Sequence, residues 1–342
     1  MSVSAATPIA LTIGDPAGIG PDITLLAFEA RHREQIPPFV FLGDKTILKA
    51  RASELGLDVR IETITSPGDA VDLFDDALPL LPIPVPVPVQ AGKPEPGAMA
   101  AVTASIEAAT EMVQSGEARA IVTNPISKSG LYQAGFEFPG HTEYLAALAT
   151  SNGQTPHPVM MLASDTLKVI PATIHIPLKD VPEALTQDLL AKTIAITDHD
   201  MRQRFGFARP RIAVSGLNPH AGEDGTLGRE EADTIASAIA AAQYAGLDVS
   251  GPYPADTLFH QAARERYDVA ICMYHDQALV PFKTLAFDEG VNVTLGLPFV
   301  RTSPDHGTAF DIAGTGKANP RSLIEALRLA DAMSAAGVSE AA

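Results

Sequence analysis

The sequence is poor in cysteine, aromatic residues and basic residues, and each shortage excludes a class of protein. A single cysteine, Cys272, among 342 residues rules out an internal disulfide and any metal site built from several cysteines. Tryptophan is absent and aromatic residues make up 6 %, so aromatic platforms for stacking nucleic-acid bases are not expected. With 24 Lys and Arg against 41 Asp and Glu, the net charge of -17 disfavours partners that require a basic surface, namely nucleic acids and anionic membranes.

The sequence also lacks a long hydrophobic run and a recognisable targeting segment. No stretch of about 20 uninterrupted apolar residues occurs, so no membrane span is expected. Residues 1–7 contain neither a basic region nor a long apolar stretch, and we therefore expect a cytoplasmic protein. Hydrophobic residues make up 46 %, which is enough for a substantial core, and the length predicts roughly two domains or one large α/β unit.

Short apolar runs alternate with amphipathic stretches along most of the chain. Expected strands cover residues 8–13, 39–42, 118–122, 167–174, 211–215, 269–274 and 291–294. Expected helices cover residues 21–30, 45–55, 102–114, 142–149, 187–205, 229–245 and 321–335. This alternation predicts an α/β fold with a mostly parallel sheet covered on both faces. Segment 78–89, with a proline at every second position from Pro82 to Pro88, is expected to be an extended edge or a connector, because proline cannot donate to a central ladder.

Three histidines follow three of the expected strands: His175, His220 and His275. Ligands gather outside the carboxyl ends of parallel strands, so the three imidazoles would meet at one edge of the sheet. Three imidazoles can hold a divalent ion such as zinc and leave one coordination position open for a substrate. For each histidine by itself a surface or hydrogen-bonded role is the alternative, and only the repeated placement favours a metal.

Two glycine-rich segments, 14–20 and 305–319, have neither the Rossmann nor the P-loop spacing. Each is either a plain turn or a place where the backbone approaches a cofactor closely. His141 and Thr142 stand at the start of an expected helix, with Thr142 as the N-cap. That helix end either binds a phosphate or carboxylate or is an ordinary cap.

Two cations lie close to His275 in the sequence, Lys283 and Arg301, with Asn292 between them. In an acidic chain they are either solvated surface charges or a clamp for an anionic ligand.

Several segments resemble the 4-hydroxythreonine-4-phosphate dehydrogenase family. They are GDPAGIGPD at 14–22, TNPISK at 123–128, GHTE at 140–143, GLNPHAGE at 216–223, PADT at 254–257, MYHDQ at 273–277, VNVTLGLP at 291–298 and RTSPDHGTA at 301–309. The resemblance extends from residue 8 to about residue 335, and the first and last segments are also similar to isocitrate and isopropylmalate dehydrogenases.

The resemblance implies two α/β/α lobes of the isocitrate/isopropylmalate dehydrogenase type, with the active site in the cleft between them, and a homodimer. We assign residues 1–128 plus 301–342 to a first lobe on the cofactor side. Residues 129–300 are assigned to a second lobe with the metal ligands and the dimerisation surface.

The implied activity is oxidation of 4-phosphooxy-L-threonine (4-hydroxythreonine 4-phosphate) with NAD or NADP in pyridoxal 5'-phosphate (vitamin B6) synthesis. The product, 2-amino-3-oxo-4-phosphooxybutanoate, then loses carbon dioxide to give 3-amino-2-oxopropyl phosphate. One divalent ion, zinc, cobalt or magnesium, is implied as well, held by His175, His220 and His275 drawn from both subunits. The implied substrate residues are His141, Thr142, Lys283, Asn292 and Arg301, of which His141 and Lys283 are the candidate catalytic groups. The implied cofactor residues are Gly14, Asp15, Gly18, Gly20, Asp305, His306, Gly307 and Asn319.

Three alternatives remain open. A paralogue with the same motifs would oxidise 4-phosphoerythronate or 4-phosphothreonate. A metal-dependent hydrolase would bind no NAD, and a non-enzymatic metal- or phosphate-binding protein would form no NADH with any substrate. The glycine-rich segment 305–319 has no purpose in the last two.

Overall fold

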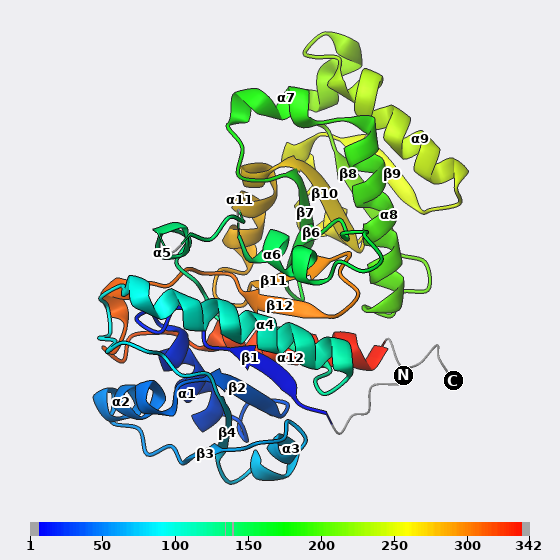
Figure 1. Cartoon of the computed structure of the whole chain (residues 1–342). Coiled ribbons are helices and arrows are strands. Elements are labelled where there is room, and N and C mark those ends of the chain that lie inside the picture. Colours follow the sequence, from blue (N-terminus) through cyan, green and yellow to red (C-terminus); the bar gives the residue numbers. More distant parts are fainter. Residues whose placement is uncertain (1–6, 134, 139, 337–342) are drawn as a thin grey trace. The chain divides into compact units, whose positions relative to one another are not determined.

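The computed structural model describes residues 7–133, 135–138 and 140–336, which fall into two units (Figure 1). Unit 1 is Met1–Pro158 with Leu297–Ala342, and unit 2 is Val159–Gly296. Residues 129–158, which we assigned to the second lobe, therefore belong to unit 1. The reason is packing, because Leu131 and Leu145 lie in the same hydrophobic cluster as Val102 of helix α4 (Met99–Ser115).

The strands of unit 1 lie in the order β3-β4-β2-β1-β5-β12, and the paired strands run parallel. Their bounds are β1 (Ile9–Thr12), β2 (Phe39–Gly43), β3 (Ile61–Thr63), β4 (Leu78–Pro82), β5 (Ala120–Val122) and β12 (Arg301–Pro304). The other helices of this unit are α1 (Gly20–Glu29), α2 (Lys45–Leu55), α3 (Asp69–Leu73), α5 (Lys128–Gln133), α6 (His141–Leu148) and α12 (Arg321–Ala336), with short turns η1 (Pro96–Ala98) and η6 (Phe310–Ile312).

Helices cover both faces of the unit 1 sheet. Side chains along a strand alternate in direction, so its buried strands present apolar side chains to both faces. Ala10 and Val40 face the cluster that contains α4. Phe39, the neighbour of Val40, faces the other way and meets Phe28 of α1 edge-on, with ring centroids 6.5 Å apart. Helix α12 packs on β12 and β5. A strand layer enclosed by helices on both sides confirms the predicted α/β class.

The proline-rich segment departs from its prediction. Strand β4 lies between β3 and β2 rather than at an edge, and it includes the buried Pro79 and the exposed Pro82. The chain continues beyond β4 with the prolines exposed, while the residues between them pack on the core. Those intervening residues keep the N–H groups, since Ile83 N donates to Gly43 O and Val85 N donates to Asp44 Oδ2. Proline is tolerated here because the alternation puts it where no donor is required.

The strands of unit 2 lie in the order β11-β6-β7-β10-β8-β9. Their bounds are β6 (Val159–Ala163), β7 (Lys168–Thr173), β8 (Ile212–Ser215), β9 (Val249–Tyr253), β10 (Val269–Tyr274) and β11 (Val291–Leu295). The β11/β6 and β6/β7 pairs are antiparallel, and β7, β10, β8 and β9 run parallel. The sheet is thus mostly parallel, as predicted.

Helix α11 (His275–Leu285) buries Phe282 in a cluster with Cys272 of β10, so this cysteine is a core residue. The other helices of unit 2 are α7 (Val181–Ala184), α8 (Gln187–Gln203), α9 (Ala236–Tyr244) and α10 (Gln261–Arg264), with short helical turns η2 (Leu178–Asp180), η3 (Pro219–Gly225), η4 (Glu231–Ile235) and η5 (Ala255–Thr257). Among the described residues, no helix has the length and apolar character needed to cross a membrane.

Candidate functional site

In unit 1 the carboxyl ends of β1, β5 and β12 lead directly into three of the segments with family motifs. The turn at 14–20 follows β1, residues 123–128 follow β5, and residues 305–319 follow β12. Because these strands are parallel neighbours, their carboxyl ends meet at one edge of the sheet, where ligands of α/β proteins bind.

The first glycine turn is buried and packed against the other two segments. A Cβ atom on Gly14, whose φ is +67°, would lie 2.6 Å from the Asn124 Cβ. One on Gly18 would lie 2.8 Å from Thr308 O, the atom that accepts a hydrogen bond from Ile19 N at 2.9 Å. Glycine is therefore required at both positions by close backbone approach within the protein itself.

Two buried acceptor atoms beside this turn have no hydrogen-bond partner among the residues described. Asp15 Oδ1 accepts from Ala17 N at 3.0 Å, whereas Asp15 Oδ2 is unpartnered. Burial raises the pKa of Asp15, against the effect of backbone N–H groups of Ala17 and Gly18. Asn124 Nδ2 donates to Thr12 O, and Asn124 Oδ1 is unpartnered. Unsatisfied buried acceptors suit a ligand that brings hydroxyl or amide donors.

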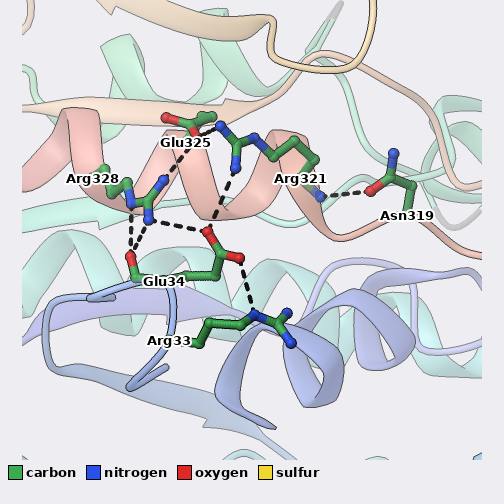
Figure 2. Close-up of polar contacts among 6 residues, drawn as sticks. All are labelled: Arg33, Glu34, Asn319, Arg321, Glu325 and Arg328. Atoms are coloured by element: carbon green, nitrogen blue, oxygen red, sulfur yellow. Dashed lines mark hydrogen bonds and ion pairs between the residues drawn. The ribbon is translucent and has the colours of Figure 1, made fainter. Parts of the chain in front are cut away.

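The second glycine-rich segment is more accessible: His306, Gly307 and Asn319 are exposed, and Asp305 is half-buried. Asn319 Oδ1 accepts from the backbone N–H of Arg321, the first residue of α12. Figure 2 shows how α12 is fixed beyond that point. Glu34 accepts hydrogen bonds from both Arg321 and Arg328.

A second group in unit 1 gathers around His141. Arg301 is buried, and its Nη2 donates to Thr123 Oγ1 at 2.6 Å. Burial lowers the pKa of the Arg301 guanidinium to about 10, against the attraction of Glu143, so it stays cationic at neutral pH. Burial also lowers the pKa of His141 well below its usual value, and the positive charges of Arg301 and Lys128 lower it further.

His141 is therefore a neutral imidazole beside two cations, and its buried Nε2 has no hydrogen-bond partner within the described part of the chain. This arrangement can hold an anion and offer one further hydrogen bond. Helix α6 begins at His141 with Gly140 at the N-cap position and no side-chain cap, so Thr142 lies inside the first turn. The prediction of Thr142 as N-cap is wrong by two positions, because the chain is already helical at His141.

In unit 2 the three predicted metal histidines follow three neighbouring parallel strands, as their spacing suggested: β7, β10 and β8. His175 and His220 have positive φ values of +46° and +52°, so turns rather than continued strands present them. The rings of His175 and His275 have centroids 5.7 Å apart. Within residues 7–133, 135–138 and 140–336 no three His, Cys, Asp or Glu side chains are grouped to hold a metal.

The donor chemistry of His175 and His275 fits a divalent ion. With metal–nitrogen distances of about 2 Å, two imidazoles on one ion place their ring centroids roughly 5 to 6 Å apart. His275 Nδ1 hydrogen-bonds to Asp276 Oδ1 at 2.7 Å, which leaves Nε2 for a metal and matches the carboxylate support usual for ligating histidines. His175, His275 and Asp276 line a hollow of about 250 Å³ with the exposed Ile176 and Leu178 on its wall.

The remaining predicted substrate residues of unit 2 lie on different elements. Asn292 is half-buried in β11, opposite Leu162 of β6. Lys283 lies in the last turn of α11, with its Nζ 5.3 Å from the ring centre of Phe287. These positions do not test whether Asn292 or Lys283 binds the substrate.

Sequence reasoning gave no role to Lys128, Asp22 or Arg51. Lys128 belongs to a family segment, so its motif was visible although its proximity to His141 was not. Asp22 and Arg51 form a buried ion pair between α1 and α2. Asp22 also lies in a family segment, at 14–22, whereas nothing in the sequence pointed to Arg51, because its burial is decided by the fold.

Comparison with solved structures defines the class of protein. The chain is similar to a 4-hydroxythreonine-4-phosphate dehydrogenase from Klebsiella pneumoniae, at 38% identity and a TM-score of 0.85, with 96% of this chain and 98% of that chain covered. It is also similar to a terephthalate 1,2-cis-dihydrodiol dehydrogenase from Burkholderia xenovorans LB400, at 26% identity and a TM-score of 0.63, with 95% and 98% covered. The fold and the class of these similar proteins are those of an α/β dehydrogenase, an oxidoreductase.

Sequence relatives define the family. The chain is 54% identical to a 4-hydroxythreonine-4-phosphate dehydrogenase of Bradyrhizobium diazoefficiens, over 98% of this chain and 99% of the relative. It is 56% identical to one of Methylorubrum extorquens, over 94% and 93%. The family model "Pyridoxal phosphate biosynthetic protein PdxA" matches residues 34–330. This chain belongs to the PdxA family of pyridoxal phosphate biosynthetic proteins, which confirms the resemblance drawn from its motifs.

Proposed function

We propose that this protein oxidises 4-phosphooxy-L-threonine at C3 with NAD or NADP, and that the 3-oxo acid then loses carbon dioxide. The observation that carries the proposal is the similarity to relatives named 4-hydroxythreonine-4-phosphate dehydrogenase over nearly their whole length. The hydrolase and binding-protein alternatives lack such support.

The buried cationic group supports an anionic substrate. Arg301 offers a guanidinium fork for a phosphate or carboxylate, and Lys128 adds a second positive charge near His141. His141, being neutral, offers its Nε2 to the substrate as a hydrogen-bonding atom; its lowered pKa makes it a weak base. We assign Thr142 to substrate binding through the first turn of α6.

A nicotinamide cofactor fits the glycine segments of unit 1. The unpartnered acceptors Asp15 Oδ2 and Asn124 Oδ1 can receive hydrogen bonds from ribose hydroxyls or a carboxamide. His306, Gly307 and Asn319 are exposed, so the rest of the dinucleotide would lie against this segment. When bound, the nicotinamide accepts the hydride that leaves C3 of the substrate.

A divalent ion fits His175 and His275, with His220 as the third proposed ligand. When bound, it stabilises negative charge on the C3 oxygen during oxidation and on the enolate left by decarboxylation. Asn292 and Lys283 remain proposed substrate residues, with Lys283 the proposed proton-transfer group.

We also propose a homodimer whose partner completes the metal site. Ile176 and Leu178 are exposed hydrophobic residues on the wall of the hollow that His175 and His275 line. Exposed apolar side chains around a polar centre are typical of a surface covered by another chain.

The test is NADH or NADPH formation by the purified protein with 4-phosphooxy-L-threonine, and in parallel with 4-phosphothreonate and 4-phosphoerythronate. We expect the first substrate to be preferred. Chelator treatment should abolish turnover, and adding back zinc, cobalt or magnesium should restore it. Preference for 4-phosphothreonate or 4-phosphoerythronate would identify the paralogue instead, and full turnover in the metal-free protein would contradict the metal.

A further inference from the structure

A buried ion pair connects the two glycine-rich segments of unit 1. Asp22 on α1 is 0 % exposed and Arg51 on α2 is 3 % exposed. Arg51 Nη1 donates to Asp22 Oδ2. The same guanidinium donates to Gly18 O at 2.9 Å and to Pro16 O at 3.3 Å, both in the first turn. Asp22 Oδ1 accepts from Gly314 N at 2.7 Å, in the second segment.

The pair spans a long separation in sequence, since Asp22 and Gly314 are 292 positions apart. A backbone hydrogen bond also links the two segments, from Ile19 N to Thr308 O at 2.9 Å. Glu54 completes the surroundings, with its Oε2 3.2 Å from Arg51 Nε. The ion pair and this backbone bond therefore fix the second segment relative to the first.

Burying two charges is an inefficient way to stabilise a fold. The desolvation of both ions offsets most of their attraction, and an apolar pair of similar volume often stabilises a core equally well. An apolar pair could not, however, bind two carbonyl oxygens of one turn and an N–H of another. What the ion pair adds is the position of these backbone groups.

We propose that Asp22 and Arg51 are positioning residues that hold the segments 14–20 and 305–319 in the arrangement that binds the dinucleotide. The proposal rests on the proposed function, which places the cofactor on these segments. Both side chains are buried, and their polar groups bind each other, Glu54 and backbone atoms of the two segments, so they act through the turns rather than by touching the cofactor.

The experiment replaces the pair by apolar residues of similar volume, Asp22→Leu with Arg51→Met. The matched control is Arg119→Met with Asp331→Leu, which removes another ion pair of unit 1, at the amino end of β5 and so at the opposite end from Asn124. Three quantities are measured without substrate: the Kd for NAD and NADP, the melting temperature, and amide hydrogen exchange of the peptide that contains Gly314.

In the Asp22/Arg51 variant we expect the Kd to rise about tenfold or more, because small displacements of a binding group are costly. Exchange at Gly314 should accelerate. The control should keep the Kd and the Gly314 exchange of the unaltered protein, whatever its melting temperature. Arg51→Lys keeps the charge but loses the planar fork, so its Kd should lie between that of the unaltered protein and that of the Asp22/Arg51 variant.

An unchanged Kd in the folded double variant, or an equal rise in the control, would overturn the positioning role alone. If the double variant does not fold, Arg51→Lys decides the question, and a Kd equal to that of the unaltered protein overturns the role. If the unaltered protein binds neither NAD nor NADP, the proposed function fails and this role fails with it.

Discussion

His141 illustrates how burial sets the chemistry of a single residue. Its ring is neutral because desolvation and the nearby charges of Arg301 and Lys128 all disfavour the protonated form. In the unfolded chain His141 binds a proton near its usual pKa of 6.5, whereas in the folded protein it stays unprotonated at that pH. The unfolded state therefore binds more protons below this pH, and the native state loses stability as the pH falls.

We expect His141→Asn to reduce this dependence. Below pH 6.5, the unaltered protein should lose up to about 1.4 kcal/mol of unfolding free energy per pH unit more than the variant. Denaturant unfolding at a series of pH values measures the difference. His199→Asn is the matched control, since that side chain is 72% exposed and its variant should retain the loss. Identical slopes for His141→Asn and the unaltered protein would contradict the neutral imidazole with its buried Nε2.

At the scale of elements, two polar side chains link the strand ends that carry the histidines. Gln277 on α11 accepts from Ser215 Oγ at 2.8 Å and from Met273 N at 2.6 Å, and its Nε2 donates to Gly216 O at 2.8 Å. Thr173 Oγ1 donates to Met273 O at 2.7 Å. The ends of β7, β10 and β8 are therefore connected by side chains beyond the ladder, which fixes where the following histidines begin.

Gln277→Ala should therefore weaken metal binding about 10- to 100-fold, as loss of a supporting group around a metal typically does. Zinc affinity is measured by competition with a coloured chelator. The control is Gln243→Ala, which removes a similar bond from a helix to a strand, Nε2 to Val249 O at 2.8 Å, on elements that carry none of the three histidines. Equal zinc affinity for the Gln277 variant and the unaltered protein would show that the strand ends hold their places without this link.

For the whole molecule, the exposed apolar residues of unit 2 bear on assembly. Leu178 is 65% exposed beside the hollow at His175, and Val280 on α11 is 63% exposed. Large apolar side chains at such positions are favourable once a second chain covers them. A dimer formed there would make metal binding and turnover depend on protein concentration.

Sedimentation of the unaltered protein should give twice the 35.9 kDa mass of the chain. Leu178→Glu with Val280→Glu should yield monomers, because a buried unpaired charge costs an interface about 2 kcal/mol or more per residue. Tyr244→Glu, at a residue 97% exposed on α9, should remain dimeric and serve as the control. A dimer that survives the double substitution would exclude this surface, and full turnover by a monomer would exclude the shared site.

Local patterns in the sequence determined most elements and where several of the proposed site residues stand relative to them. The apolar runs predicted β1 and β10 closely, and Pro21 marked the start of α1, because these depend on neighbours within a few residues. The histidines after β7, β8 and β10 were visible for the same reason. Family motifs suggested the proposed substrate-binding roles of His141 and Arg301, which spacing alone left open.

The tertiary structure decided what depends on residues far apart in the chain. Beyond β4 the chain accepts a proline at every second position because the residues between them, Ile83 and Val85, donate the hydrogen bonds. Residues 129–158 join unit 1 because their apolar side chains pack there. The pairing of Asp22 with Arg51 and Gly314, like the neutral state of His141, arises from burial among distant groups. Such burial is a property of the packed chain, which is why no local pattern contains it.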